Sequence, residues 1–304
     1  MDALPVLFYE ATLSYFDYLG SLDAFLRLNG LLGELALDLF KQAFSHHIFV
    51  NNGRLDSQRC KSASNRFEIN YDAEKIRSKY NKKTVVVLRA SGLAYETDPG
   101  MIETLQAATR GKDLTLALAT ANISNEMELW INSLKIGYFH INTSITGVIQ
   151  RIIERMVKKK TLHSIFFMID KPLEPAVIEL LVALFKQEQF LAAQLPKDCS
   201  YVMQAMRHLI DSWRTQSAKM AGKHVWCENV FVAFLRTANF GFVDCTEEEE
   251  ERYVSTLYPV GQGIRGRWSA GQRFSASVLR NRNGHAIYWL FPENEAADNL
   301  VLFV

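Results

Sequence analysis

The stretch TVVVL at residues 84–88 decides the fold class, because comparable runs of apolar, β-forming residues recur along the middle of the chain. They recur at 114–118, 136–141, 164–169 and, more weakly, 190–193, and a sixth begins at residue 223. Segments with helical spacing lie between them, near 99–110, 124–134, 145–160, 174–187 and 200–221. Strands and helices that alternate about every 20 to 30 residues predict parallel strands joined by crossover helices.

Successive units of this kind resemble an irregular leucine-rich-repeat array. The alternative is a single open, doubly wound sheet. Each run is apolar on both faces or nearly so, which is typical of parallel strands covered by other elements. We therefore expect parallel strands that neighbour one another in sequence order. Their side chains are expected to be mostly buried at Val85, Val87, Leu114, Leu116, Tyr138, Ile141, Ile165, Phe167 and Ile169.

The regions on either side of this array have other patterns. A helical pattern covers the first 45 residues, with one helix expected from about Leu31 to Phe44. Residues 51–66 are polar and rich in turn formers, so we expect a loop and a domain boundary there. Asn281–Gly284 favours a hairpin in the tail, because Asn-Gly supplies the positive φ that such turns need. The strand patterns of the tail cover 252–258, 272–280, 285–291 and 299–303.

These patterns together predict an α/β protein in three parts. Residues 1–50 form a helical module, and residues 67–245 form the α/β repeat-like region. Residues 246–304 form an antiparallel β tail. A solenoid needs its last apolar face covered, and the tail is expected to serve as that cap.

The composition argues against several classes of function. The net charge is only +1, so a nucleic-acid or acidic-membrane surface is not expected. No run reaches the roughly 18 to 20 apolar residues that span a bilayer, and no basic leader precedes the first apolar stretch. The scattered cysteines form no CxxC pair and are typical of reduced thiols in a cytoplasmic or nuclear protein. They are Cys60, Cys199, Cys227 and Cys245.

No motif indicates a catalytic, cofactor or metal site. Gly261–Gly266 matches GxGxxG, but no helical pattern follows it, so nucleotide binding is not expected. His46 and His47 lack further ligands at metal spacing and are interpreted as the end of a helix. The strand ends offer one acid and one base but no nucleophile–base pair. These strand-end residues are Arg89, Ser91, Thr120, Asn142 and Asp170.

The opening MDALPVLFYE at 1–10 resembles the start of a nematode-expanded F-box-like family with an F-box-associated, leucine-rich-repeat-like region. VALFKQEQF at 182–190 is similar to a helix-then-Gln-Phe unit of that family, and NRNGHAIYW at 281–289 to its terminal hairpin. The resemblance implies an N-terminal module that docks a Skp-type adaptor. It also implies that the chain is a substrate receptor of a cullin-based ubiquitin ligase. The candidate adaptor-binding residues are Leu4, Pro5, Leu7, Phe8 and Leu13.

The sequence therefore favours a protein-interaction module over an enzyme. The first alternative is a non-catalytic scaffold or decoy, in which residues 1–45 only cap the core and bind no adaptor. The second alternative is an enzyme on an open α/β sheet, with a pocket at the carboxyl ends of the strands. The sequence does not name the protein target.

Overall fold

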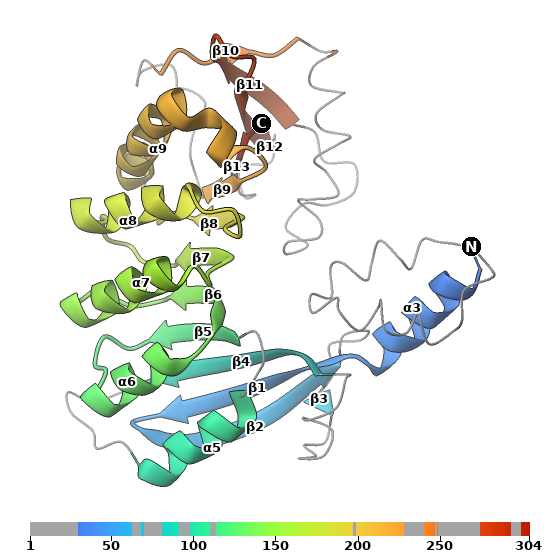
Figure 1. Ribbon diagram of the computed structural model, residues 1–304, viewed down its shortest axis with the longest axis vertical. Coiled ribbons are helices and arrows are strands. Elements are labelled where there is room, and N and C mark those ends of the chain that lie inside the picture. Colours follow the sequence, from blue (N-terminus) through green and yellow to red (C-terminus); the bar gives the residue numbers. More distant parts are fainter. Residues whose placement is uncertain are drawn as a thin grey trace. The chain divides into compact units, whose positions relative to one another are not determined.

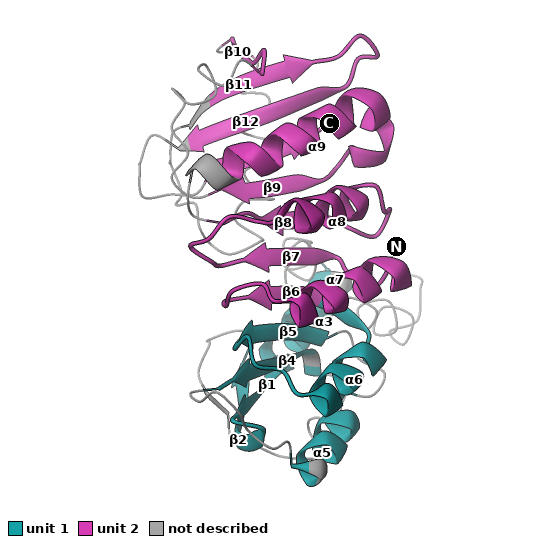
Figure 2. Cartoon of the chain, turned by 90° about the vertical axis from the view of Figure 1, so that its left-hand side faces the viewer, with its two compact units in different colours: residues 1–137 teal, residues 138–304 magenta. Residues whose placement is uncertain are grey.

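The computed structural model describes residues 30–62, 68–69, 81–90, 98–109, 114–196, 199–227, 240–246, 248, 274–292 and 299–304. They form a mixed α/β protein, as the sequence predicts. The chain divides into two compact units, residues 1–137 and residues 138–304 (Figure 2). The three-part domain division stays a prediction. Within the described residues, no helix has both the length and the apolar character needed to cross a membrane.

Unit 1 combines a mixed sheet with helices. Its described elements are α3 (Leu31–Gln42), β1 (Phe44–Asn51), β2 (Arg54–Ser62), β3 (Glu68–Ile69), β4 (Asn81–Arg89), α5 (Pro99–Thr109), β5 (Leu114–Ala119) and α6 (Asn125–Ser133) (Figure 1). The strands lie in the order β5-β4-β1-β2-β3. β1 is parallel to β4 and β4 to β5, whereas β2 is antiparallel to both β1 and β3.

β1 and β2 form a hairpin where a loop was expected, so the loop prediction for 51–66 was wrong over most of its length. The turn residues Asn52 and Gly53 have φ angles of 50° and 71°, which is the left-handed geometry of a two-residue hairpin turn. The amide of Asn52 donates to the carbonyl of Arg89 (3.0 Å), and that of Asp98 donates to the carbonyl of Gly53 (3.0 Å). The turn is thus fixed to the end of β4 and the start of α5.

The two adjacent histidines lie in a strand, so the prediction that they end a helix was also wrong. The expected helix is present, but α3 ends at Gln42 and the backbone is extended at Ala43. Side chains of β1 then alternate strictly between buried and half-buried positions, with Asn51 exposed at the end. His46 therefore faces the core and His47 faces away from it.

One face of the unit 1 sheet forms the core of that unit. The register places Ile48 beside Val86, and Val86 beside Leu116, and all three side chains are fully buried. Helices α5 and α6 lie together on one side of these strands (Figures 1 and 2). They contribute buried side chains to the core, which are Met101 and Leu105 of α5 and Met127, Trp130 and Ile131 of α6.

Unit 2 contains the longer part of the strand–helix alternation. Its described elements are β6 (Ile136–Ile141, whose first two residues belong to unit 1), α7 (Gly147–Lys159), β7 (Ser164–Phe167), α8 (Pro175–Phe185), β8 (Ala192–Gln194), α9 (Cys199–Met220), β9 (His224–Cys227), β10 (Val243–Asp244), β11 (Phe274–Arg280), β12 (Ala286–Pro292) and β13 (Asn299–Phe303). The strand order is β6-β7-β8-β9-β13-β12-β11-β10. The neighbours among β6, β7, β8 and β9 are parallel to one another. The pairings of β9 with β13, β13 with β12, β12 with β11 and β11 with β10 are antiparallel.

Helices α7, α8 and α9 pack side by side on one face of the unit 2 sheet (Figure 2). The strand residues on that face include Phe139, Ile165, Ala193 and Val225, which are fully buried. Phe185 of α8 lies against this face. The centroid of its ring lies 5.1 Å from that of Phe190 and 5.6 Å from that of Phe303. Burial of large aromatic side chains between one helix layer and one sheet stabilises this unit.

The strand predictions are confirmed in most particulars. β4 and β5 are parallel neighbours in unit 1, and β6 to β9 follow one another in sequence order in unit 2. The expected tail strands at 272–280, 285–291 and 299–303 are present, and the strand expected at 252–258 lies outside the described residues. Val87 and Tyr138 are only half-buried, and they lie on the sheet faces that do not pack against α5 to α9. The other seven side chains expected in the core are buried, namely Val85, Leu114, Leu116, Ile141, Ile165, Phe167 and Ile169.

Candidate functional site

The residues that the sequence marks as functional lie apart from one another or outside the described chain. The candidate adaptor-binding residues Leu4, Pro5, Leu7, Phe8 and Leu13, together with Ser91 and Gly261–Gly266, are outside it. Thr120 is buried, and its hydroxyl accepts a hydrogen bond from the amide of Asn122 (3.1 Å). Asn142 and Asp170 are exposed. In the described part, no group of three or more His, Cys, Asp or Glu side chains is placed to hold a metal ion.

The second face of the unit 1 sheet carries an unusual concentration of positive charge, and we name it the basic face. It consists of the side chains that alternate with the core residues along β1, β2 and β4. Register pairing places Ser45 between Lys61 of β2 and Lys83 of β4. At the other end of β1, Asn51 lies between Arg54 and Arg89. The charged and aromatic members of the basic face are His47, Phe49, Arg54, Arg59, Lys61, Lys83 and Arg89, and the same register places Ser45, Asn51, Ser57, Val85 and Val87 on it.

Phe49 is the centre of the basic face. The guanidinium carbon of Arg59 lies 5.6 Å from the centroid of its ring, and that of Arg89 lies 5.3 Å from it. The ring of His47 stacks on the same aromatic ring at 6.4 Å, with an angle of 18° between the planes. Arg59 comes from β2 and Arg89 from β4, so cations from both neighbouring strands converge on one ring.

Hydrogen bonds fix the end of the basic face at which Ser45 lies. Ser45 Oγ lies 2.8 Å from His47 Nε2, and the same hydroxyl donates to the carbonyl oxygen of Lys61 (3.5 Å). This hydroxyl therefore ties β1 to β2 and helps to hold the imidazole over the ring of Phe49. Both arginines that approach the ring are exposed, whereas Phe49 and His47 are half-buried.

Acidic residues are scarce in the sequence of the three strands that carry these cations. Asp56 is the sole acidic residue in the sequence of β1, β2 and β4, and it lies where the register shifts between Phe49 and Val50. Its carboxylate accepts a hydrogen bond from the neighbouring Ser57 hydroxyl (3.4 Å). Glu68 of β3 pairs in register with Lys61, at the edge of the face. Five lysine and arginine residues on one sheet face contrast with a net charge of only +1 for the whole chain.

The face was missed in the sequence because its residues were divided between a supposed helix end and a supposed loop. Two signals could have revealed it. Phe44, His46, Ile48 and Val50 are apolar or core-compatible at every second position, which is the period of a strand. Asn52-Gly53 then follows, and Asn-Gly after such a run is a strong hairpin signal.

The face of the unit 2 sheet that does not pack against α7, α8 and α9 has a different character, and most of its described side chains are buried. Aromatic and polar side chains cross it from β6 to β9, and the ring of His140 lies 4.4 Å from that of Phe166. His224 is nine-tenths buried, and burial lowers the pKa of its imidazole to about 4. Its Nε2 has no hydrogen-bond partner among the described residues. The row contains Tyr138, His140, Ser164, Phe166, Gln194, His224 and Trp226.

Polar contacts at the starts of the unit 2 strands serve the fold. Lys223 Nζ donates to the carbonyl of Gln187, and Gln187 Nε2 donates to the carbonyl of Val157 (2.8 Å). His163 Nδ1 lies 3.0 Å from the carbonyl of Gln189. Burial lowers the pKa of Lys223, although the charge of Glu188 opposes that shift. These bonds join the last turn of α7 and the segments that follow α7, α8 and α9 to one another.

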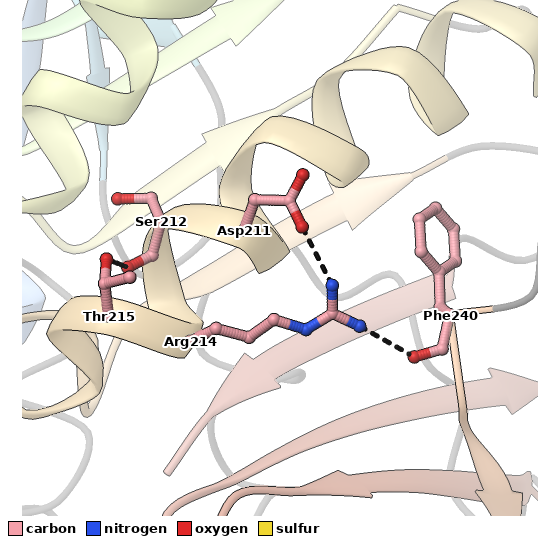
Figure 3. A network of polar contacts seen from close by, with 5 residues as sticks. All are labelled: Asp211, Ser212, Arg214, Thr215 and Phe240. Carbon is pink, nitrogen blue, oxygen red and sulfur yellow. Dashed lines mark hydrogen bonds and ion pairs between the residues drawn. The ribbon is translucent and has the colours of Figure 1, made fainter.

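A second set of polar contacts ties α9 to the chain at Phe240 (Figure 3). Arg214 donates to the Asp211 carboxylate (2.9 Å) and to the carbonyl of Phe240 (3.3 Å). The guanidinium of Arg207 approaches the buried ring of Phe240 at 6.0 Å. The guanidinium of Arg214 is satisfied by Asp211 and Phe240, so these contacts stabilise the packing of α9 and indicate no binding site.

Comparison with known proteins finds no matching family model, no matching curated protein and no matching solved structure. The resemblance to F-box-like proteins therefore stays a prediction that rests on the quoted residues.

Proposed function

We propose that this chain is a non-catalytic protein-interaction module that binds its partner on the basic face of unit 1. The observation that carries the proposal is the exposed pair Arg59 and Arg89, held against the ring of Phe49. Arginine and aromatic side chains dominate the affinity of protein interfaces. Rigid β strands position these groups, so that little conformational freedom is lost when a partner binds.

The finer form of the proposal is a substrate receptor of a cullin-based ubiquitin ligase in the cytoplasm or nucleus. In this form, Leu4, Pro5, Leu7, Phe8 and Leu13 dock a Skp-type adaptor, and the α/β region holds the protein target. The strand–helix units would form an irregular leucine-rich-repeat-like array, and β11 to β13 would cap it. Support comes from the N-terminal resemblance and from the sequence order of the parallel strands.

Site-specific photocrosslinking in cells tests the interaction module. A crosslinking residue at Asn51, which is exposed on the basic face, should form an adduct with another protein. The control places the same crosslinking amino acid at Leu129 of α6, where the natural side chain is 68% exposed. This control should form no adduct. The Asn51 adduct should disappear when Arg59→Gln and Arg89→Gln are introduced together. An adduct that persists in that variant, or forms equally at Leu129, would contradict the assignment of the face.

Binding to a purified Skp-type adaptor tests the receptor form separately. The full chain should bind the adaptor, and Leu7→Asp with Phe8→Asp should abolish binding, because charged groups cannot pack into an apolar groove. Affinity capture that recovers neither a cullin nor a Skp-type protein would remove the ligase role. The chain would then be a scaffold or decoy, and the basic face would keep its proposed role.

A further inference from the structure

We propose that one edge of the unit 2 sheet binds the surface of a bilayer that contains anionic lipids. We name it the cationic edge, and it is separate from the basic face of unit 1. It consists of the connections at 160–163, 186–191, 221–223 and 281–285, together with the last turns of α7 and α9. The proposal follows from the topology of the sheet, the distribution of charge and the exposure of one leucine.

The topology of unit 2 brings these connections to the same edge. Parallel strands begin at one edge of a sheet, so the helices that precede them end there (Figure 2). Backbone hydrogen bonds follow this edge from strand to strand. The amide of Leu191 donates to the carbonyl of His163 (2.8 Å), and that of Phe303 donates to the carbonyl of Lys223 (2.9 Å). The turn between β11 and β12 lies at this edge too, because β13 ends beside the start of β12.

The cationic edge extends in two directions. The strands along it follow in the order β7-β8-β9-β13-β12, and a spacing of about 4.8 Å between neighbours makes this row about 19 Å long. The ends of α7, α8 and α9 form a second row beside the strands, since these helices pack side by side at about 8 to 10 Å. Two rows make a broad surface rather than a groove for one extended chain.

Positive charge is concentrated on this edge. Glu188 is the only acidic residue in the four connections, and it interacts electrostatically with the buried Lys223. At the opposite edge, the connection from β7 to α8 holds Asp170, Lys171 and Glu174, so it has no excess of positive charge. Five cations of the cationic edge are exposed or half-exposed and have no ion-pair or side-chain hydrogen-bond partner among the described residues, namely Lys158, Lys160, Lys186, Lys219 and Arg282.

Lys160 has a backbone conformation that lysine adopts only at a cost. It ends α7 with φ 54° and ψ 43°, the left-handed region in which helices usually end with glycine. Lys158 and Lys159 already place positive charge at this end of the helix, so the macrodipole does not require a third lysine. Backbone strain at a residue other than glycine indicates a functional side chain.

An exposed leucine lies among these cations. Leu191 is 49% exposed, although its amide and its carbonyl are held by hydrogen bonds to His163 and His224. Phe190, the residue before it, is fully buried. An aliphatic side chain among lysines is suited to a bilayer surface, because the ammonium groups meet the lipid phosphates while the apolar group enters the boundary of the acyl chains.

Nucleic acid and acidic protein segments fit this edge less well. Single strands bind largely by stacking bases on open aromatic rings, but Phe190 is the only Phe, Tyr or Trp in the four connections and it is buried. Four of the five cations are lysines, which act as point charges and lack the planar fork that suits a carboxylate. The net charge of +1 did not indicate the edge, because it averages over the whole chain.

Sedimentation of the full chain with lipid vesicles tests the proposal. Vesicles of phosphatidylcholine with about 30% phosphatidylserine should bind the chain, and vesicles of phosphatidylcholine alone should not, because the attraction depends on anionic headgroups. Added salt should weaken the binding as it screens the charges. Absence of binding to the phosphatidylserine vesicles at low salt would overturn the proposal. A short DNA duplex that removes the chain from these vesicles at an equal concentration of negative charge would overturn the choice of a bilayer.

Matched charge variants locate the binding on the molecule. Lys219→Gln should weaken vesicle binding about fivefold, the usual contribution of one lysine near an anionic surface. Lys171→Gln removes the same charge from an exposed position at the opposite edge and should change the affinity by less than about twofold. Equal losses in both variants would show that the attraction is only general, and would overturn the site. Arg59→Gln with Arg89→Gln should also leave vesicle binding within about twofold, and a loss in that variant alone would place the contact in unit 1.

Lys160→Gly separates binding from stability. Glycine adopts the left-handed conformation without strain, so the melting temperature should stay the same or rise. Vesicle binding should nevertheless fall about fivefold, because one cation is lost from the edge. A lysine with a merely structural role would give the reverse result, a lower melting temperature and unchanged binding.

A charge-conserving variant tests the contact with the acyl boundary. Leu191→Gln should weaken vesicle binding several-fold although the charge is unchanged. Leu129→Gln, at the exposed leucine of α6, is the control and should change binding by less than about twofold. Unchanged binding in both Leu191→Gln and Lys219→Gln would overturn the inference. The outcome is independent of the Asn51 photocrosslink, because the two surfaces belong to different units and either proposal can fail without the other.

Discussion

Individual residues show how strongly the alternation of a strand determines their environment. His46 and His47 are adjacent, yet the first is fully buried and the second is half-exposed beside Phe49. His46 Nε2 lies 3.0 Å from Gln58 Oε1, so the buried imidazole has a polar partner on the neighbouring strand. A composition-based argument cannot distinguish two such histidines, because the difference arises from the period of two along β1.

Truncation of Phe167 tests the core of unit 2. This side chain is 1% exposed on the helix-covered face of β7. Phe167→Ala should lower the free energy of unfolding by about 3 to 5 kcal/mol, the usual cost of removing a buried aromatic side chain. Chemical denaturation of both proteins measures the difference. An unchanged midpoint would contradict the placement of Phe167 in the core.

The buried imidazole of His224 should make stability depend on pH. Burial lowers its pKa from 6.5 to about 4 in the folded chain. Below pH 6.5 the unfolded chain binds a proton that the folded chain does not, so stability should fall as the pH falls from 6.5 toward 4. The lost stability is at most about 3 to 4 kcal/mol, since each pKa unit corresponds to about 1.4 kcal/mol.

The variant His224→Gln isolates this effect from the other titrating groups. The difference in unfolding free energy between the natural chain and the variant should shrink as the pH falls through that window. Denaturant titrations at several pH values provide the measurement. A difference that is constant with pH would show that the imidazole does not titrate as proposed.

At the scale of elements, apolar periodicity predicted the described helices and the parallel strands β4 to β9 within a few residues, but it did not predict β1. The helix expected at 145–160 is α7 at Gly147–Lys159, and the strand expected at 114–118 is β5 at Leu114–Ala119. β2 was missed because it contains a single fully buried residue, Cys60, and carries no apolar alternation. Its pairing with β1 and the turn at Asn52-Gly53 define it instead. The basic face depends on that pairing, so it was missed as well.

The terminal hairpin, which was predicted, offers a test of turn geometry. Gly284 has a φ of 83°, a conformation that side chains with a Cβ adopt at a cost. Asn281 Oδ1 also accepts hydrogen bonds from the amides of Asn283 (2.9 Å) and His285 (3.1 Å). Gly284→Ala should lower stability by about 1 to 2 kcal/mol. Arg282→Ala, at an exposed neighbouring position, is the control and should have little effect in the same thermal melts.

At the scale of the whole molecule, the chain divides into two compact units whose sheets carry different side chains. The candidate basic face lies wholly in unit 1, whereas the aromatic and polar row from Tyr138 to Trp226 lies in unit 2. Sequence reasoning reached the local elements of both units. It did not reach the basic face, because cations far apart in the sequence come together only through strand pairing.

This division predicts that the two units respond separately to substitution. Every residue of the basic face belongs to unit 1, so Phe167→Ala in unit 2 should leave the yield of the Asn51 photocrosslink almost unchanged. The crosslink must be formed at a temperature where the variant is folded, as judged by its own melting curve. Arg59→Gln with Arg89→Gln should show the reverse pattern, with loss of the crosslink and an almost unchanged melting temperature, because both side chains are exposed. If Phe167→Ala abolished the crosslink while the chain stayed folded, the interaction could not be assigned to the basic face alone.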